Sequence, residues 1–211
     1  MTDENVASGA GSHATANGDS PRVQQPPGRR RWSEVLMHRW PTALGVAVAA
    51  LTAFDLQVDA GFVSSISAVV VLMALVYIGA AALDRRRASW AVLLAGLLPA
   101  LFIPATSGIN PSVILLAAAA AFLVVGVARG QLRRPGGLML QGAGVLAFGS
   151  TALAALFVAP ELGAYLVAFA LLGHAGWDAY HYLRDRVVVR SYAEFCGVLD
   201  LLVGVAILVM A

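Results

Sequence analysis

The sequence predicts an all-α membrane protein with seven transmembrane helices, a cytoplasmic N-terminus and a C-terminus outside the cell. Three observations predict this fold class. The 211 residues are 59% hydrophobic and only 12% charged, about half the charged fraction of a typical soluble domain. The apolar residues form seven runs, most of them near the ~20 residues that a helix needs to cross a bilayer. The arginines lie in alternate breaks between these runs.

Two polar segments precede the apolar runs. Residues 1–28 are rich in Ser, Gly, Asn, Asp and Pro and offer almost nothing to bury, so they predict a disordered cytoplasmic tail. Residues 29–40 read RRRWSEVLMHRW and place Trp and aliphatic residues at helical spacing among arginines. That pattern is typical of a basic segment at the membrane surface. Residues 41–211 then form the predicted seven-helix transmembrane domain.

Short polar breaks separate the predicted spans. The spans cover residues 41–58, 61–83, 89–106, 112–128, 137–158, 162–182 and 193–211. In the third span, Pro99 and Pro104 predict a kink or an early end, because proline cannot donate a backbone hydrogen bond within the helix.

Small residues follow one side of the fifth predicted span. Such residues let helix backbones approach closely where no hydrophobic effect drives association, so they predict packing against another helix. They are Ala143, Ala147, Ser150, Thr151 and Ala154.

The distribution of arginine predicts the orientation. Arginines precede the first span and follow the second, fourth and sixth: Arg29, Arg30, Arg31, Arg39, Arg85, Arg86, Arg87, Arg129, Arg133, Arg134, Arg184, Arg186 and Arg190. The breaks near Asp59, Asn110 and Glu161 contain none. Because cytoplasmic loops carry the excess of basic residues, we expect a multi-pass protein of the cell membrane with its N-terminus inside. The late start of the first run predicts no cleaved signal peptide.

Charge and cysteine content exclude some classes of partner and site. The formal net charge of +2 gives no indication of a nucleic-acid partner. The expected partners are the lipid bilayer and either another membrane protein or a second copy of the chain. The single cysteine, Cys196, excludes an intramolecular disulfide and a metal site built from several cysteines.

The last two spans carry the candidate functional residues. His174, Asp178 and His181 have the spacing i, i+4 and i+7, which places them on one face of the sixth span. Cys196 and Asp200 share a face of the seventh span, and a short connection between the two spans predicts similar depths for Asp200 and His174. Charged residues inside a bilayer usually face the interior of the bundle. Three residues of other spans are predicted to complete this wall in the cytoplasmic half: Tyr77, Asp84 and Gln141.

Three interpretations of these residues remain open. In the first, the cluster binds Zn or Fe and activates water in a membrane hydrolase, since mixed nitrogen and oxygen ligands suit these metals. Its predicted metal ligands are His174, Asp178, His181 and Asp200, and its candidate catalytic groups are Asp178, Glu194 and Asp200. In the second, acidic and imidazole groups relay protons or ions in a small transporter.

The third interpretation is a polar clamp that fixes the last helix hairpin in a scaffold or partner-binding protein. Arg184 and Arg190 would then pair with Asp185 and Glu194. This interpretation accounts for most of the polar residues in the two spans, so it is the one that the sequence favours.

The stretch GHAGWDAYHYLRDRVVVRSYAEFCGVLD resembles the end of uncharacterised multi-pass membrane proteins of high-GC bacteria. The shared pattern is H-x-x-W-D-x-x-H followed by A-E-F-C, and it covers the last two spans. The resemblance implies a membrane protein and carries no known activity. Seven spans with His and Asp near the cytoplasmic face are also similar to the seven-helix zinc amidohydrolases of the alkaline ceramidase and adiponectin-receptor type. Those enzymes use three histidines from separate spans, whereas both embedded histidines here lie on one helix, so no mechanism is transferred.

Overall fold

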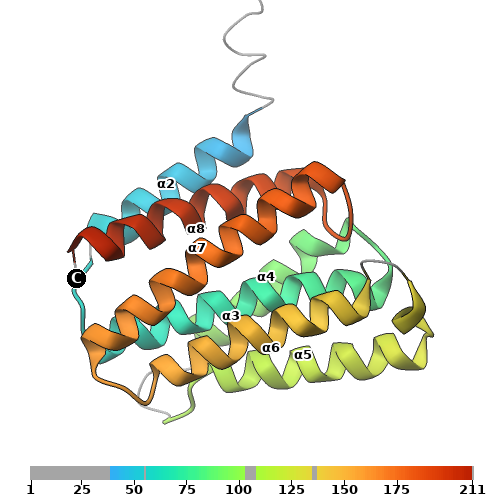
Figure 1. Cartoon of the computed structure of the whole chain (residues 1–211), viewed down its shortest axis with the longest axis horizontal. Helices are drawn as coiled ribbons and strands as arrows, with labels where there is room; N and C mark the ends of the chain where they lie inside the picture. Colours follow the sequence, from blue (N-terminus) through green and yellow to red (C-terminus); the bar gives the residue numbers. More distant parts are fainter. Residues whose placement is uncertain (1–38, 55, 103–107, 135–136, 211) are drawn as a thin grey trace, which may run out of the picture.

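The computed structural model describes residues 39–54, 56–102, 108–134 and 137–210. In these ranges the chain forms seven α-helices and one short 3-10 helix, with no strand (Figure 1). The helices are α2 (Trp40–Phe54), α3 (Ala60–Leu83), α4 (Ala88–Phe102), α5 (Pro111–Ala128), α6 (Leu138–Ala155), α7 (Pro160–Arg184) and α8 (Arg190–Met210). The all-helical class is confirmed, with one helix for each predicted span. The predicted tail 1–28 lies outside the described residues, as does nearly all of the segment 29–40.

Four of these helices, α3, α5, α6 and α8, are long and apolar enough to cross a membrane. Helices α2 and α4 are apolar but have only 15 residues each. Helix α7 has 25 residues, but its polar side chains lower its hydropathy and it does not belong to this set. Helix α4 includes Pro99 and is described as far as Phe102; Pro104 lies outside the described residues, so the predicted early end of the third span stays a prediction. These observations indicate a membrane protein.

Helix α3 is the central element of the fold. Every residue from Val70 to Ala80 is buried, and a helix that is apolar on all sides is suited to such a position. Helices α4, α5, α6 and α7 pack around it, while α8 packs on α7 and α2 packs on α8. Figure 1 shows α3 running through the middle of the bundle, between α8 with α2 on one side and α6 with α5 on the other.

The predicted packing of the small residues on α6 is wrong within this chain. Most of that stripe is exposed, and the hydroxyl groups of Ser150 and Thr151 donate to the Ala147 carbonyl of their own helix. The side that faces the bundle instead includes Gln141, Gly144, Ala152 and Ala155. On that side the Gln141 amide meets Trp177 and His181 of α7, the hydrogen-bond partners that a polar group needs inside an apolar bundle.

The arginine-rich connections α3–α4, α5–α6 and α7–α8 lie together at one end of the bundle, which we call the arginine end (Figure 1). Helices α3 and α7 each stop there at an aspartate with left-handed backbone, Asp84 with φ 53° and Asp185 with φ 50°. Arg134 forms an ion pair with Asp84, and Arg86 donates to both carboxylate oxygens of Asp185. Asp84 therefore caps a helix at the arginine end instead of joining the predicted polar wall.

Helix α8 contacts α7 on one side and α2 on another. Arg39 forms an ion pair with Glu194 at 3.2 Å, and the Thr42 hydroxyl group also donates to that carboxylate. The predicted pairing of Glu194 with an arginine after the sixth span is therefore wrong, because this side of α8 faces α2. Arg190 pairs with Asp185 instead, at 3.3 Å, and Asp185 also pairs with Arg86.

Candidate functional site

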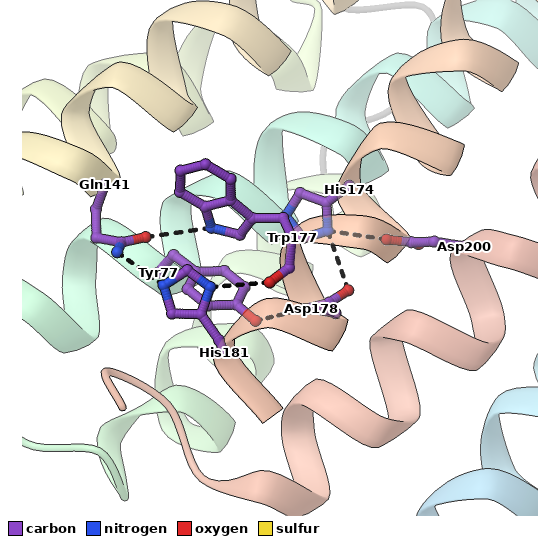
Figure 2. Close-up of polar contacts among 7 residues, drawn as sticks. All are labelled: Tyr77, Gln141, His174, Trp177, Asp178, His181 and Asp200. Atoms are coloured by element: carbon purple, nitrogen blue, oxygen red, sulfur yellow. Dashed lines mark hydrogen bonds and ion pairs between the residues drawn. The ribbon is translucent and has the colours of Figure 1, made fainter. Parts of the chain in front are cut away.

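Helix α7 buries one polar face against its neighbours. His174, Asp178 and His181 follow one another at helical spacing, and their exposed fractions are only 1%, 0% and 2%. The common face that the spacing predicted is confirmed, and it is buried along its whole length. Figure 2 shows these side chains pointing toward residues of α3, α6 and α8.

His174 lies between two carboxylates. Its Nδ1 atom is 2.9 Å from Asp200 Oδ2 on α8 and 3.2 Å from Asp178 Oδ2 on its own helix. One ligand atom from each residue lies within 4.8 Å of the other two. We call His174, Asp178 and Asp200 the acid–imidazole cluster. Its members meet because α7 and α8 form a hairpin with a short connection, as the sequence predicted.

Helix α3 contributes Tyr77 to the cluster. The phenol hydroxyl group of Tyr77 donates to Asp178 Oδ1 at 2.5 Å, and both side chains are buried. The Tyr77 ring also lies edge-on to the imidazole of His174, with ring centroids 5.6 Å apart. The predicted contribution of Tyr77 to the wall of the site is confirmed.

His181 belongs to a second network, beside the cluster. Trp177 Nε1 donates to Gln141 Oε1 at 3.3 Å, and Gln141 Nε2 lies 3.0 Å from His181 Nε2. His181 Nδ1 lies 2.9 Å from the carbonyl oxygen of Trp177. With Gln141 donating to Nε2, the proton of the ring lies on Nδ1 and donates to that carbonyl. Both ring nitrogens of His181 are thus engaged, and this residue lies outside the group of three close ligand atoms.

Two atoms of the cluster have no hydrogen-bond partner in the part of the chain that the structure describes. They are His174 Nε2 and Asp200 Oδ1, and both are buried. Two buried carboxylates and one imidazolium would leave a net negative charge, which is costly in an apolar interior. A proton or a metal cation bound at these atoms would offset that charge.

The other candidates on α8 lie apart from the close ligand atoms. Cys196 is a buried free thiol one turn before Asp200 and is not part of the group of three. Glu194 faces α2, as described above. Sequence reasoning missed Phe148, whose ring packs against His174 with centroids 4.9 Å apart. Its spacing of seven residues from Gln141 on α6 was the signal that could have placed it on the same face.

Burial limits the chemistry of the cluster. Each of its residues is 0–1% exposed, so the described conformation admits a proton or a single ion but no organic substrate. The chain thus combines an all-helical fold, four helices able to cross a membrane and one buried cluster of His and Asp. Compared with family models, curated proteins and solved structures, the chain matches none.

Proposed function

We propose that this chain is a seven-span protein of the cell membrane, with its N-terminus in the cytoplasm and its C-terminus outside. Four helices long and apolar enough to cross a membrane support this proposal. The three arginine-rich connections at one end of the bundle support the orientation, because basic residues mark the cytoplasmic side. On this arrangement the acid–imidazole cluster lies in the cytoplasmic half of the bilayer.

The cluster acts as a polar clamp in a scaffold that binds another membrane protein or a second copy of the chain. The observation that carries this proposal is complete burial of polar side chains from four helices, α3, α6, α7 and α8. In a bilayer the hydrophobic effect does not drive helices together, so association depends on close packing and hydrogen bonds between helices. The clamp supplies these contacts between the last hairpin and α3 and α6.

The clamp is tested by the thermal stability of purified variants in detergent. Removing the imidazole in His174→Ala leaves two buried carboxylates facing each other, and breaking a buried charged pair costs about 3–5 kcal/mol. We expect a large fall in Tm for this variant. Leu201→Ala, which truncates an exposed side chain of α8, is the control and should melt close to the parent. A His174→Ala variant as stable as the parent would refute the clamp.

A second candidate, a metal centre, is favoured by the positions of the ligand atoms. The Nδ1 atom of His174 lies 2.9 and 3.2 Å from the two carboxylates. Metal–ligand bonds of about 2.1 Å place the ligands of a tetrahedral zinc ion about 3.4 Å apart, so the two carboxylates would move outward by a few tenths of an ångström to bind one. The hydroxyl group of Tyr77 would orient the Asp178 carboxylate, as partners of metal ligands commonly do. For Asp200 and Asp178 to be catalytic groups of a hydrolase using Zn or Fe, the chain would have to open, because both carboxylates are fully buried in the described conformation. No observation on the described residues favours the relay interpretation over these two.

Metal analysis of the purified chain separates the two candidates. A metal centre predicts about one Zn or Fe per chain, lost in Asp200→Asn and retained in Glu194→Gln, an acidic residue of the same helix outside the cluster. It also predicts that a chelator lowers Tm. The metal centre would be refuted if the chain is free of metal after purification and after incubation with Zn or Fe, and if the chelator leaves Tm unchanged. The polar clamp would then be the remaining candidate.

A further inference from the structure

The arginine end contains a cavity of about 310 Å³ that the proposed function does not use. It lies where the end of α3, the start of α6 and the α7–α8 connection meet. Four arginines line it: Arg85, Arg86, Arg134 and Arg186. They come from three different connections of the chain, so the fold and not the local sequence brings them to one cavity.

The charge of this cavity is positive after its internal ion pairs are counted. Asp84 neutralises Arg134, and Asp185 neutralises Arg86. The hydrogen bonds from Arg86 hold the pKa of the Asp185 carboxyl below its usual range, so this pair stays charged at neutral pH. Arg85 and Arg186 have no side-chain partner within the described ranges. Two positive charges therefore remain for a ligand.

The lining of the cavity is amphipathic. Ala80, Ala81 and Val187 contribute apolar surface beside the arginines, and Gln131 contributes a side chain that is only 6% exposed. Guanidinium groups donate in a planar fork that fits phosphate oxygens. A ligand that carries one phosphate next to an apolar body matches this combination of charge and surface.

We propose that the cavity at the arginine end binds the phosphate of an anionic phospholipid, with Arg85 and Arg186 as its principal contacts. The proposal rests on the proposed function, which locates this end at the cytoplasmic surface of the bilayer. Anionic lipids concentrate in that leaflet, and basic pockets between transmembrane helices are known sites for their headgroups. The paired arginines, Arg86 and Arg134, line the same cavity.

The test compares lipids by native mass spectrometry and thermal shift of the full chain in a neutral detergent. Phosphatidylglycerol and cardiolipin should bind and raise Tm, whereas phosphatidylcholine should not. A direct charge-assisted hydrogen bond from a guanidinium group to the phosphate contributes about fivefold or more in affinity. We therefore expect about fivefold weaker binding of the anionic lipids in Arg85→Gln and in Arg186→Gln, and about 25-fold in the double variant. Arg87→Gln, in the same connection but outside the cavity lining, is the matched control and should bind like the parent.

Inorganic phosphate and glycerol 3-phosphate form the second arm of the experiment. Binding of these soluble anions with the affinity of the lipids would overturn a lipid site in favour of a free phosphate site. Equal binding of phosphatidylcholine, or equal loss in Arg87→Gln, would also overturn it. Alkaline carbonate extraction of cell membranes tests the membrane location separately. A chain that stays in the membrane but shows no lipid preference would refute the lipid site and leave the proposed function standing.

Discussion

At the scale of single residues, Asp178 connects the central helix to the last hairpin. One of its oxygens accepts from the Tyr77 hydroxyl group, and the other faces the imidazole of His174. A buried carboxylate needs such donors, because each hydrogen bond to a charged group contributes about 1.5–3 kcal/mol. Asp178 is therefore held by one residue of α3 and one residue of its own helix, α7.

Removing the phenol hydroxyl group isolates this dependence. We expect Tyr77→Phe to lower the free energy of unfolding by about 1.5–3 kcal/mol, because the Asp178 carboxylate loses a donor while the ring stays in place. Thermal or chemical unfolding in detergent measures the change. Tyr165→Phe, at a half-exposed position on α7, should leave stability unaltered. Equal stability of the two variants would mean that Tyr77 does not hold the carboxylate.

The sequence predicted part of this site, for reasons that the structure makes clear. A spacing of four residues puts His174 and Asp178 on one face, and a short hairpin brings Asp200 to their depth. Tyr77 and Asp84 looked equivalent on the same span, but the helix ends at Leu83 and Asp84 turns away with left-handed backbone. The partner of Glu194 was not predictable, because it depends on which helix packs against the other side of α8.

At the scale of helices, a glycine sets the contact between α2 and α8. A Cβ atom placed on Gly45 would lie 2.8 Å from the backbone oxygen of Phe195, which is closer than atoms can approach without a shift. The contact between these two helices therefore requires glycine at this position. The same contact gives Glu194 its partners Arg39 and Thr42.

Gly45→Ala should separate these helices. We expect a loss of about 1–3 kcal/mol in unfolding free energy, the usual cost of inserting a methyl group into a packed contact. Gly176→Ala on α7 is the control, because nothing lies within 4 Å of its added Cβ atom, and it should be as stable as the parent. The two variants are compared by their melting temperatures. If Gly45→Ala has the same Tm as Gly176→Ala, the contact between α2 and α8 is not closely packed.

The helices themselves were more predictable than the faces they bury. Apolar runs and arginine-rich breaks gave one helix per span, because both signals are local in the sequence. The exposed small residues of α6 show the limit of this reasoning. Small side chains permit close packing on any side, and small residues also lie on the side that is buried, where Gln141 bonds to α7.

At the scale of the whole molecule, the arginine end defines an orientation that can be measured. Exposed Gln57 lies in the α2–α3 connection at the other end of the bundle, and Arg87 lies at the arginine end. In intact cells, a membrane-impermeant maleimide should label Gln57→Cys but label Arg87→Cys only after lysis. The native Cys196 is buried and should give no background, which Cys196→Ser checks. Labelling of both positions from outside would refute the seven-span arrangement.

The central place of α3 has a consequence for the order in which the protein is made. Tyr77 precedes Asp178 by 101 residues, so Tyr77 is already synthesised when the hairpin that carries its hydrogen-bond partner emerges from the ribosome. The two carboxylates and the imidazole of that hairpin therefore find α3 already present to pack against.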